Sequence, residues 1–312
     1  MCRLLGVVAA EAAPVSELLA DQLGPFLALA GEHRDGWGLA LQAPNGSIRR
    51  VRGLGRADHS PHLAHVLRSW RTRAAILHLR KATPGLAVDA RNTHPFGTPH
   101  LALAHNGAFA PVEALDALIG PELLARAEGT TDSERLQLAV RARTEKGMPA
   151  GQALEAVAAD IRRLATSYVS ANTLLLTPEG LFAYADHDPE SEVSRRRGLG
   201  YFGLDCLRPR PDRTVIASAG HQPAPTTWHR LPERRTWHIT PTCPPSLSPP
   251  FEVATPPSLH PRRPPGHRGD DERGSECGTP SPGPQSSPHG NLHNPPSPVK
   301  DDGRASMTQG EI

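Results

Sequence analysis

The sequence predicts an α+β domain over residues 1–240, with mixed or antiparallel sheets covered by helices, and a proline-rich tail over residues 241–312. Strand-like segments gather toward both ends of the domain, with two long amphipathic segments between them. This order differs from the strict strand–helix alternation of a doubly wound parallel sheet. The tail holds 17 of the 34 prolines and one aromatic residue, Phe251. Because it can bury too little apolar surface to offset its ordering entropy, we expect it to be disordered.

Four segments have the spacing of amphipathic helices. Residues 15–30 and 151–167 repeat apolar side chains three and four positions apart, which gathers them on one helical face. A third helix is expected to begin where Thr131 or Asp132 can cap its N-terminus, with Glu134 close behind. The helices expected are 15–30, 62–71, 132–144 and 151–167.

Short apolar runs bounded by turn residues predict the strands. The turn-like sequence Pro44-Asn45-Gly46 separates two such runs, and Pro178-Glu179-Gly180 separates two more, which is typical of hairpins. The strands expected are 2–9, 36–42, 48–52, 74–79, 101–105, 173–176, 181–185, 214–217 and 236–240.

Charge and cysteine content exclude several classes of protein. The 34 basic and 32 acidic residues leave a net charge of +2, without a basic stripe interleaved with aromatic residues, so nucleic-acid binding is not expected. No apolar run approaches the roughly 18 residues of a membrane span, and no export signal is evident, so we expect a soluble cytoplasmic protein. The cysteines at positions 2, 206, 243 and 277 form no Cys-x-x-Cys pair. We therefore expect no disulfide, metal site or cofactor.

Cys2 is the first candidate for chemistry. Removal of the initiator methionine would leave a cysteine whose own α-amine, with an ordinary pKa near 7.7–8.0, can take a proton at neutral pH. Nucleophile and base would then belong to one residue. The alternative is a small apolar residue at the start of a buried strand, and position alone favours that alternative.

Three further segments carry groups that would suit one ligand. Arg80 ends an expected strand and could bind a carboxylate with two guanidinium N–H donors. The alternative is an ordinary surface cation. Asn106 and Gly107 offer a side-chain amide and a backbone N–H to an oxyanion, although Asn-Gly is also a common tight turn. Asp132 could pair with an ammonium group or simply cap a helix. A thiol, an oxyanion pair, a cation and an anion together fit glutamine or another γ-glutamyl compound.

The ordered motifs resemble those of the class II (N-terminal nucleophile) glutamine amidotransferases, specifically their compact stand-alone branch. The resemblance covers about 230 of the 312 residues. It rests on MCRLLG at residues 1–6, DGWG at 35–38, HLRKATPG at 78–85, NTHPF at 92–96, HNGAF at 105–109 and TDSE at 131–134.

This resemblance implies an αββα four-layer sandwich of the Ntn-hydrolase type, with two stacked, largely antiparallel sheets flanked by helices. It implies hydrolysis of a γ-glutamyl amide through a Cys2 thioester, which releases glutamate and ammonia or an amine. Asn106 and Gly107 would stabilise the oxyanion. The substrate-binding residues implied are Arg80, Thr83, Asp132, His94 and Trp37, the last two as supports of the pocket. Two positions depart from the family pattern, namely Lys81, where several relatives have an aromatic residue, and Ala219, where many have Glu.

Three alternatives stay open for the activity. The ammonia acceptor could be a separate synthase subunit. The chain could instead be a dedicated γ-glutamyl hydrolase of thiol metabolism, related to ergothioneine or glutathione. A non-enzymatic glutamine-sensing module is less favoured, because it predicts loss of the nucleophile or of the oxyanion donor, and both are present.

Overall fold

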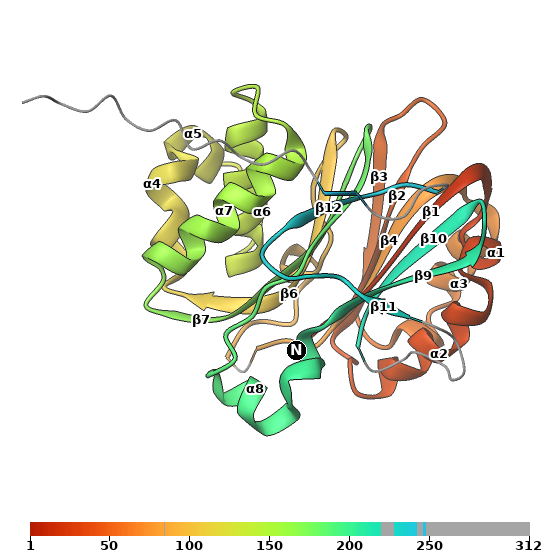
Figure 1. Cartoon of the computed structure of the whole chain (residues 1–312), viewed down its shortest axis with the longest axis horizontal. Helices are drawn as coiled ribbons and strands as arrows, with labels where there is room; N and C mark the ends of the chain where they lie inside the picture. The colour runs from red at the N-terminus through yellow and green to blue at the C-terminus, as the bar shows by residue number, and fades with distance from the viewer. Residues whose placement is uncertain (84, 220–227, 242–245, 248–312) are drawn as a thin grey trace, which may run out of the picture. The chain divides into compact units, whose positions relative to one another are not determined.

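Two antiparallel sheets form the centre of the part of the chain that the structure describes, which comprises residues 1–83, 85–219, 228–241 and 246–247 (Figure 1). The structure is a computed structural model. Its first compact unit runs from Met1 to Ala254. The tail expected over 241–312 lies outside the described residues, except for residue 241 and the strand at 246–247.

The first sheet, sheet A, has the strand order β11-β9-β10-β1-β4-β2-β3, and each neighbouring pair is antiparallel. Its strands are β1 (Arg3–Pro14), β2 (Gly36–Gln42), β3 (Ile48–Gly53), β4 (Arg71–Arg80), β9 (Leu204–Arg210), β10 (Arg213–Ser218) and β11 (His229–Arg230).

The second sheet, sheet B, has the order β13-β12-β8-β7-β6-β5, again with antiparallel neighbours. Its strands are β5 (Phe96–Thr98), β6 (Leu101–Ala110), β7 (Ser167–Thr177), β8 (Gly180–Tyr184), β12 (Thr236–Ile239) and β13 (Ser246–Leu247).

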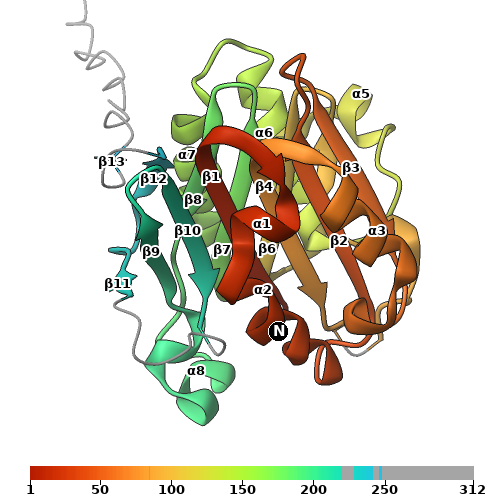
Figure 2. The ribbon, with the colours of Figure 1, turned by 90° about the vertical axis from the view of Figure 1, so that its right-hand side faces the viewer.

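Helices cover the outer faces of both sheets, as Figures 1 and 2 show. On sheet A lie α1 (Val15–Leu19), α2 (Leu23–Ala28) and α3 (Pro61–Ser69); on sheet B lie α4 (Asp116–Ile119), α5 (Pro121–Leu124), α6 (Asp132–Thr144) and α7 (Ala150–Leu164). Helix α8 (Glu192–Arg197) lies near the N-terminus. Short 3-10 turns occupy η1 (Ala20–Gln22), η2 (Leu29–Gly31), η3 (Ala57–His59), η4 (Ala90–Asn92), η5 (Val112–Leu115) and η6 (Leu199–Phe202).

Three apolar cores separate four layers. One lies between sheet A and its helices, one between the two sheets, and one between sheet B and its helices. Strand β4 shows the alternation that creates them: Ala75, Leu77 and Leu79 face the helices, whereas Ala74 and Ile76 face the other sheet. The αββα sandwich expected from the resemblance is confirmed.

The local predictions differ from the structure in several places, and three of them bear on the site or on the sheets. The helix expected over 15–30 is divided into short pieces, with a positive φ of 40° at Ala20 where α1 ends. The strand expected to end at residue 105 continues to Ala110, so Asn106 and Gly107 lie inside β6 and form no turn. Strand β9 was not predicted, because LDCLRPR contains a proline and shows four consecutive buried residues rather than an alternating pattern.

Candidate active site

A small cavity of about 30 Å³ lies between the N-terminus, the end of β4, the middle of β6 and the start of α6. Its lining includes six of the eight residues selected from the sequence: Cys2, Arg80, Thr83, His94, Gly107 and Asp132. Met1 also lines it and takes up space beside Cys2. A groove of about 720 Å³ elsewhere, next to the β7–β8 hairpin, contains none of the eight.

Cys2 is half-buried, and its Sγ lies 3.7 Å from the backbone carbonyl oxygen of Lys81. Burial raises the pKa of the Cys2 thiol, so the thiol needs a base before it can attack. Burial also lowers the pKa of the Met1 α-amine beside it. An amine placed in this corner is therefore more readily neutral at physiological pH, which is the form that accepts a proton.

Arg80 ends β4 on the face directed toward sheet B and is only 3% exposed. One guanidinium nitrogen, Nη2, donates to the Ala87 carbonyl at 3.0 Å, whereas Nη1 is buried without a hydrogen-bond partner among the described residues. Burial lowers the pKa of Arg80 but leaves it a cation. A buried cation with a free donor is suited to a ligand carboxylate.

Asp35 holds the segment after Arg80 in place. Its N–H donates to the Arg80 carbonyl at 3.2 Å, and its Oδ2 accepts from the Ala82 N–H at 2.8 Å. These bonds fix the backbone that carries Lys81 and Thr83. The exposed Thr83 lines the cavity, as the resemblance implied for a substrate-binding residue.

Asp132 is the first residue of α6 and faces the cavity. Thr131 is the N-cap, since its Oγ1 accepts from the Glu134 N–H at 3.1 Å. The Asp132 carboxylate accepts from the Phe109 N–H at 3.1 Å through Oδ2 and from the Ser133 N–H at 2.8 Å through Oδ1. Each oxygen keeps lone-pair capacity, so the carboxylate can still accept from an ammonium group.

Asn106 and Gly107 lie side by side in β6. The side chain of Asn106 is fully buried on the face toward sheet A, where Ala102 and Ala104 also point, and it is not among the residues lining the cavity. Neither its Nδ2 nor its Oδ1 has a partner among the described residues. A Cβ added at Gly107 would lie 1.8 Å from the Ser170 carbonyl, so only glycine fits at this position.

His94 lines the cavity and stacks on His78, with ring centroids 4.2 Å apart. Burial holds the pKa of His94 well below its usual value and that of His78 at about 3, so both rings are neutral at pH 7. Strand β2 approaches closely here: a Cβ at Gly38 would lie 1.9 Å from the His94 carbonyl. The DGWG motif therefore has a packing role at the site.

Trp37 lies apart from the other selected residues. Its ring belongs to the core between sheet A and its helices and packs edge-on against His62, with centroids 6.0 Å apart. It is absent from the cavity lining. The expected contribution of Trp37 to substrate binding thus has no direct contact to support it, because alternation along β2 turns its side chain to the outer face of the sheet.

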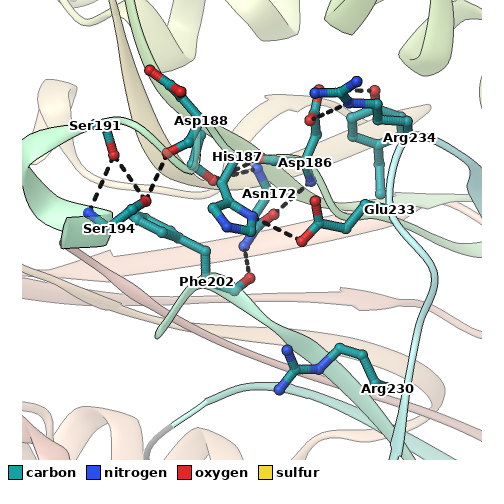
Figure 3. A network of polar contacts seen from close by, with 12 residues as sticks. Asn172, Asp186, His187, Asp188, Ser191, Ser194, Phe202, Arg230, Glu233 and Arg234 are labelled. Atoms are coloured by element: carbon teal, nitrogen blue, oxygen red, sulfur yellow. Dashed lines mark hydrogen bonds and ion pairs between the residues drawn. The ribbon is translucent and has the colours of Figure 1, made fainter. Parts of the chain in front are cut away.

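Residues that the sequence analysis did not select hold strand β6 in place around Asn106 and Gly107. Ser170 in β7 donates from Oγ toward the Asn106 carbonyl at 3.1 Å and the Asp186 carbonyl at 2.9 Å. Asn172 donates from Nδ2 to the Phe202 carbonyl and accepts from the Asp186 N–H at 2.9 Å (Figure 3). Nothing in the pattern SYVSAN distinguishes these side chains from ordinary strand residues, because their partners come from distant segments.

Two other missed residues fix the loops around the cavity. His105 donates from Nε2 to the Ser170 carbonyl at 3.0 Å, which leaves Nδ1 to accept from the Ser133 hydroxyl at 2.9 Å. Asn92 accepts from the Thr130 N–H at 3.0 Å through Oδ1. Both belong to motifs quoted above, NTHPF and HNGAF, and that membership was the signal available in the sequence. Both side chains are buried in the structure.

The described residues contain no group of three or more His, Cys, Asp or Glu arranged to hold a metal ion. Among the described helices, none combines the length and apolar character needed to cross a membrane.

Comparison with protein families matches residues 1–202 to the model described as glutamine amidotransferases class-II. Curated protein sequences give no match. Among solved structures, a glutamine aminotransferase class-II domain protein from Silicibacter pomeroyi is similar, with TM-score 0.54 and 18% identity over 77% of this chain and 95% of that one. Glutamine phosphoribosylpyrophosphate amidotransferase from B. subtilis has TM-score 0.50 and 17% identity over 77% of this chain and 47% of that enzyme. At these identities the structural likeness concerns the fold.

Proposed function

The chain belongs to the class II glutamine amidotransferases, enzymes that act on amide bonds, and from this membership we propose that it hydrolyses a γ-glutamyl amide through a thioester on Cys2. The observation that carries the proposal is the buried, unpartnered Nη1 of Arg80, a residue that lines the cavity together with Cys2, and the equally unpartnered amide of Asn106, the residue next to the lining residue Gly107. Buried polar groups are normally paired, and a ligand would supply both partners.

In the proposed binding mode, the substrate α-carboxylate takes the free Nη1 of Arg80 and the α-ammonium group binds Asp132. Removal of Met1 is required, because the residue lines part of the cavity and its peptide bond to Cys2 makes the Cys2 nitrogen an amide, which cannot act as a base. The cavity enlarges when the methionine is gone. Thr83 and His94 contribute to the walls.

In the proposed reaction, the Cys2 α-amine accepts the thiol proton and Sγ attacks the γ-carbonyl carbon. The oxyanion takes hydrogen bonds from Asn106 Nδ2 and the Gly107 N–H. The C–N bond then breaks, the amine leaves with the proton from the Cys2 ammonium group, and a γ-glutamyl thioester remains. Water attacks the thioester, which releases glutamate and regenerates the thiol. Neutral His78 and His94 add no positive charge that would compete for the substrate carboxylate.

Intact mass and activity measured on one sample test this proposal. We expect the mature protein to lack Met1, to gain a single adduct at Cys2 from the glutamine analogue 6-diazo-5-oxonorleucine, and to release glutamate from glutamine or from a γ-glutamyl amide. Cys2→Ala should lose both the label and the turnover. Cys206→Ala is the matched control, since burial raises the pKa of Cys206 to about 11 and makes its thiol unreactive. Full activity in Cys2→Ala would refute the proposal.

The same assay separates the remaining alternatives. Turnover of glutamine supports an amidotransferase whose acceptor belongs to a separate synthase subunit, in a family that acts on glutamine and often pairs with synthase domains. Turnover of a γ-glutamyl compound but not of glutamine supports a dedicated hydrolase, of thiol metabolism or otherwise. The cytoplasmic location and the domain boundary at residue 240 stay predictions.

A further inference from the structure

A cluster of positively charged side chains adjoins the cavity through Lys81. Lys81 lines the cavity, and its backbone carbonyl lies 3.7 Å from Cys2 Sγ. Its Nζ donates to Glu32 Oε1 at 2.9 Å, and Arg197 at the end of α8 donates to the same oxygen at 3.1 Å. Two cations thus share one carboxylate oxygen, and the cluster of Lys81, Arg197 and Glu32 has an excess positive charge.

A third cation lies next to this cluster. Arg3 follows Cys2 directly, is 5% exposed and stacks on the ring of Tyr201, 4.3 Å from its centroid. Arg197 lies over the same ring at 5.5 Å. Arg3 Nε is buried without a partner among the described residues. The single negative charge of Glu32 therefore faces three positive charges. Hydrogen bonding from Lys81 lowers the pKa of Glu32 to about 2 and keeps it ionised.

The position of the cluster relates it to one part of the substrate. The amine leaves from the carbon that Sγ attacks, so the leaving group lies within a few ångströms of the thiol, next to Lys81. In the proposed binding mode, the glutamyl part of the substrate binds Arg80 and Asp132. The Lys81 and Arg197 side chains are 37% and 43% exposed, so both reach solvent, and Lys81 also lines the cavity. Ammonia is too small to reach both cations.

We propose that Lys81 and Arg197 form a subsite for an anionic leaving group, so that the preferred substrate is a γ-glutamyl amide whose amine part carries a carboxylate, such as a γ-glutamyl peptide. This inference rests on the proposed function and specifies its substrate class. In the bound state the substrate carboxylate takes donors from both cations, and Glu32 holds the two side chains in place while the subsite is empty.

Two substrates that differ by one charge test the subsite. γ-Glutamylalanine carries the carboxylate, and γ-glutamylalaninamide replaces it with a neutral amide. We expect kcat/KM to favour the acid by about tenfold, as for a charge-assisted contact at a partly exposed site. The preference should shrink in 1 M salt, where the screening length falls to about 3 Å.

Variants that remove either a positive or a negative charge from the cluster make the test specific. Lys81→Met and Arg197→Gln should each lower the acid-over-amide ratio about three- to tenfold, whereas Glu32→Gln should raise it. Arg195→Gln is the matched control, because it removes a cation from the same helix that pairs with Glu190 at 3.8 Å and does not contact Glu32. The ratio should not change in this control.

The outcomes separate the two levels of the proposal. Equal turnover of both substrates, or equal ratios in all four variants, would leave the Cys2 chemistry standing and refute the anionic subsite. Absence of turnover for either substrate and for glutamine, with no labelling of Cys2, would refute the proposed function and the subsite with it.

Discussion

Asn172 lies directly opposite Asn106 across the antiparallel pair β6–β7, so the two side chains share one face of sheet B. Both are fully buried. The amide of Asn172 is bonded to Phe202 and Asp186, whereas the amide of Asn106 has no partner among the described residues. Two residues of the same type on adjacent strands therefore differ in their hydrogen bonding: Asn172 holds two other segments, whereas Asn106 has the free donor that we propose binds the oxyanion.

Substitution of these two asparagines should separate stability from catalysis. Asn106→Ala should lower kcat by about 10²–10³, the usual cost of one oxyanion donor, without lowering the free energy of unfolding, because no hydrogen bond is lost. Asn172→Ala should instead destabilise the fold by about 1–3 kcal/mol, since it leaves the Phe202 carbonyl and the Asp186 N–H unpaired. Chemical denaturation and steady-state kinetics check both. Equal stability losses in the two variants would contradict this assignment.

Arg80→Lys should raise KM by roughly ten- to a hundredfold while kcat changes less, because lysine keeps the charge but lacks the planar guanidinium that donates to the Ala87 carbonyl and to the substrate carboxylate at the same time. Steady-state kinetics with glutamine or a γ-glutamyl amide check this. The control is Arg91→Lys, at an exposed arginine paired with Asp89 at 2.9 Å. A KM that moves in the control but not in Arg80→Lys would argue against carboxylate binding by Arg80.

Gly107→Ala should abolish turnover and destabilise the fold, because the new methyl group would overlap the Ser170 carbonyl and force β6 and β7 apart. Thermal unfolding and activity measure the two effects. The control is Gly46→Ala in the β2–β3 turn, where an added Cβ meets no atom within 4 Å and so causes no steric overlap. It should retain activity, at a modest cost in stability from its φ of 82°.

The buried histidines should make the fold sensitive to acid. The pKa of His78 is about 3 in the folded protein, below its unfolded value near 6.5, so the unfolded chain binds more protons between these limits. Stability that is present at pH 7 is then lost as pH falls below 6.5. His78 alone contributes a slope of about 1.4 kcal/mol per pH unit.

His78→Phe should remove this part of the slope between pH 4.5 and 6, measured by denaturant unfolding at several pH values. The phenyl ring keeps the stack on His94 and does not titrate. His59→Gln, at a largely exposed position, is the control and should keep the wild-type slope. An unchanged slope in His78→Phe would mean that His78 does not exchange a proton on unfolding.

The sequence could predict elements whose signal is local. Strand β2 was predicted with its observed bounds, and α6 was predicted from its cap at Thr131 and its length. The edge strand β11 and the proline-containing β9 carry weak local patterns, and they exist because neighbouring strands supply their hydrogen bonds. Such elements depend on tertiary contacts that no window of sequence contains.

The residues proposed to react with or to bind the substrate could be selected along the chain, because Cys2, Arg80, Asn106 and Asp132 each stand in a short motif that resembles one of the family's motifs. Their neighbours in space could not. Only the tertiary structure placed the end of β4 and the middle of β6 beside the N-terminus, directed the Trp37 face of β2 to the outer helices, and brought Arg197 to the same Glu32 oxygen as Lys81 from 116 residues further along the chain. The physical reason is that side-chain type is set by the sequence, whereas burial, pairing and proximity are set by strand register and layer packing.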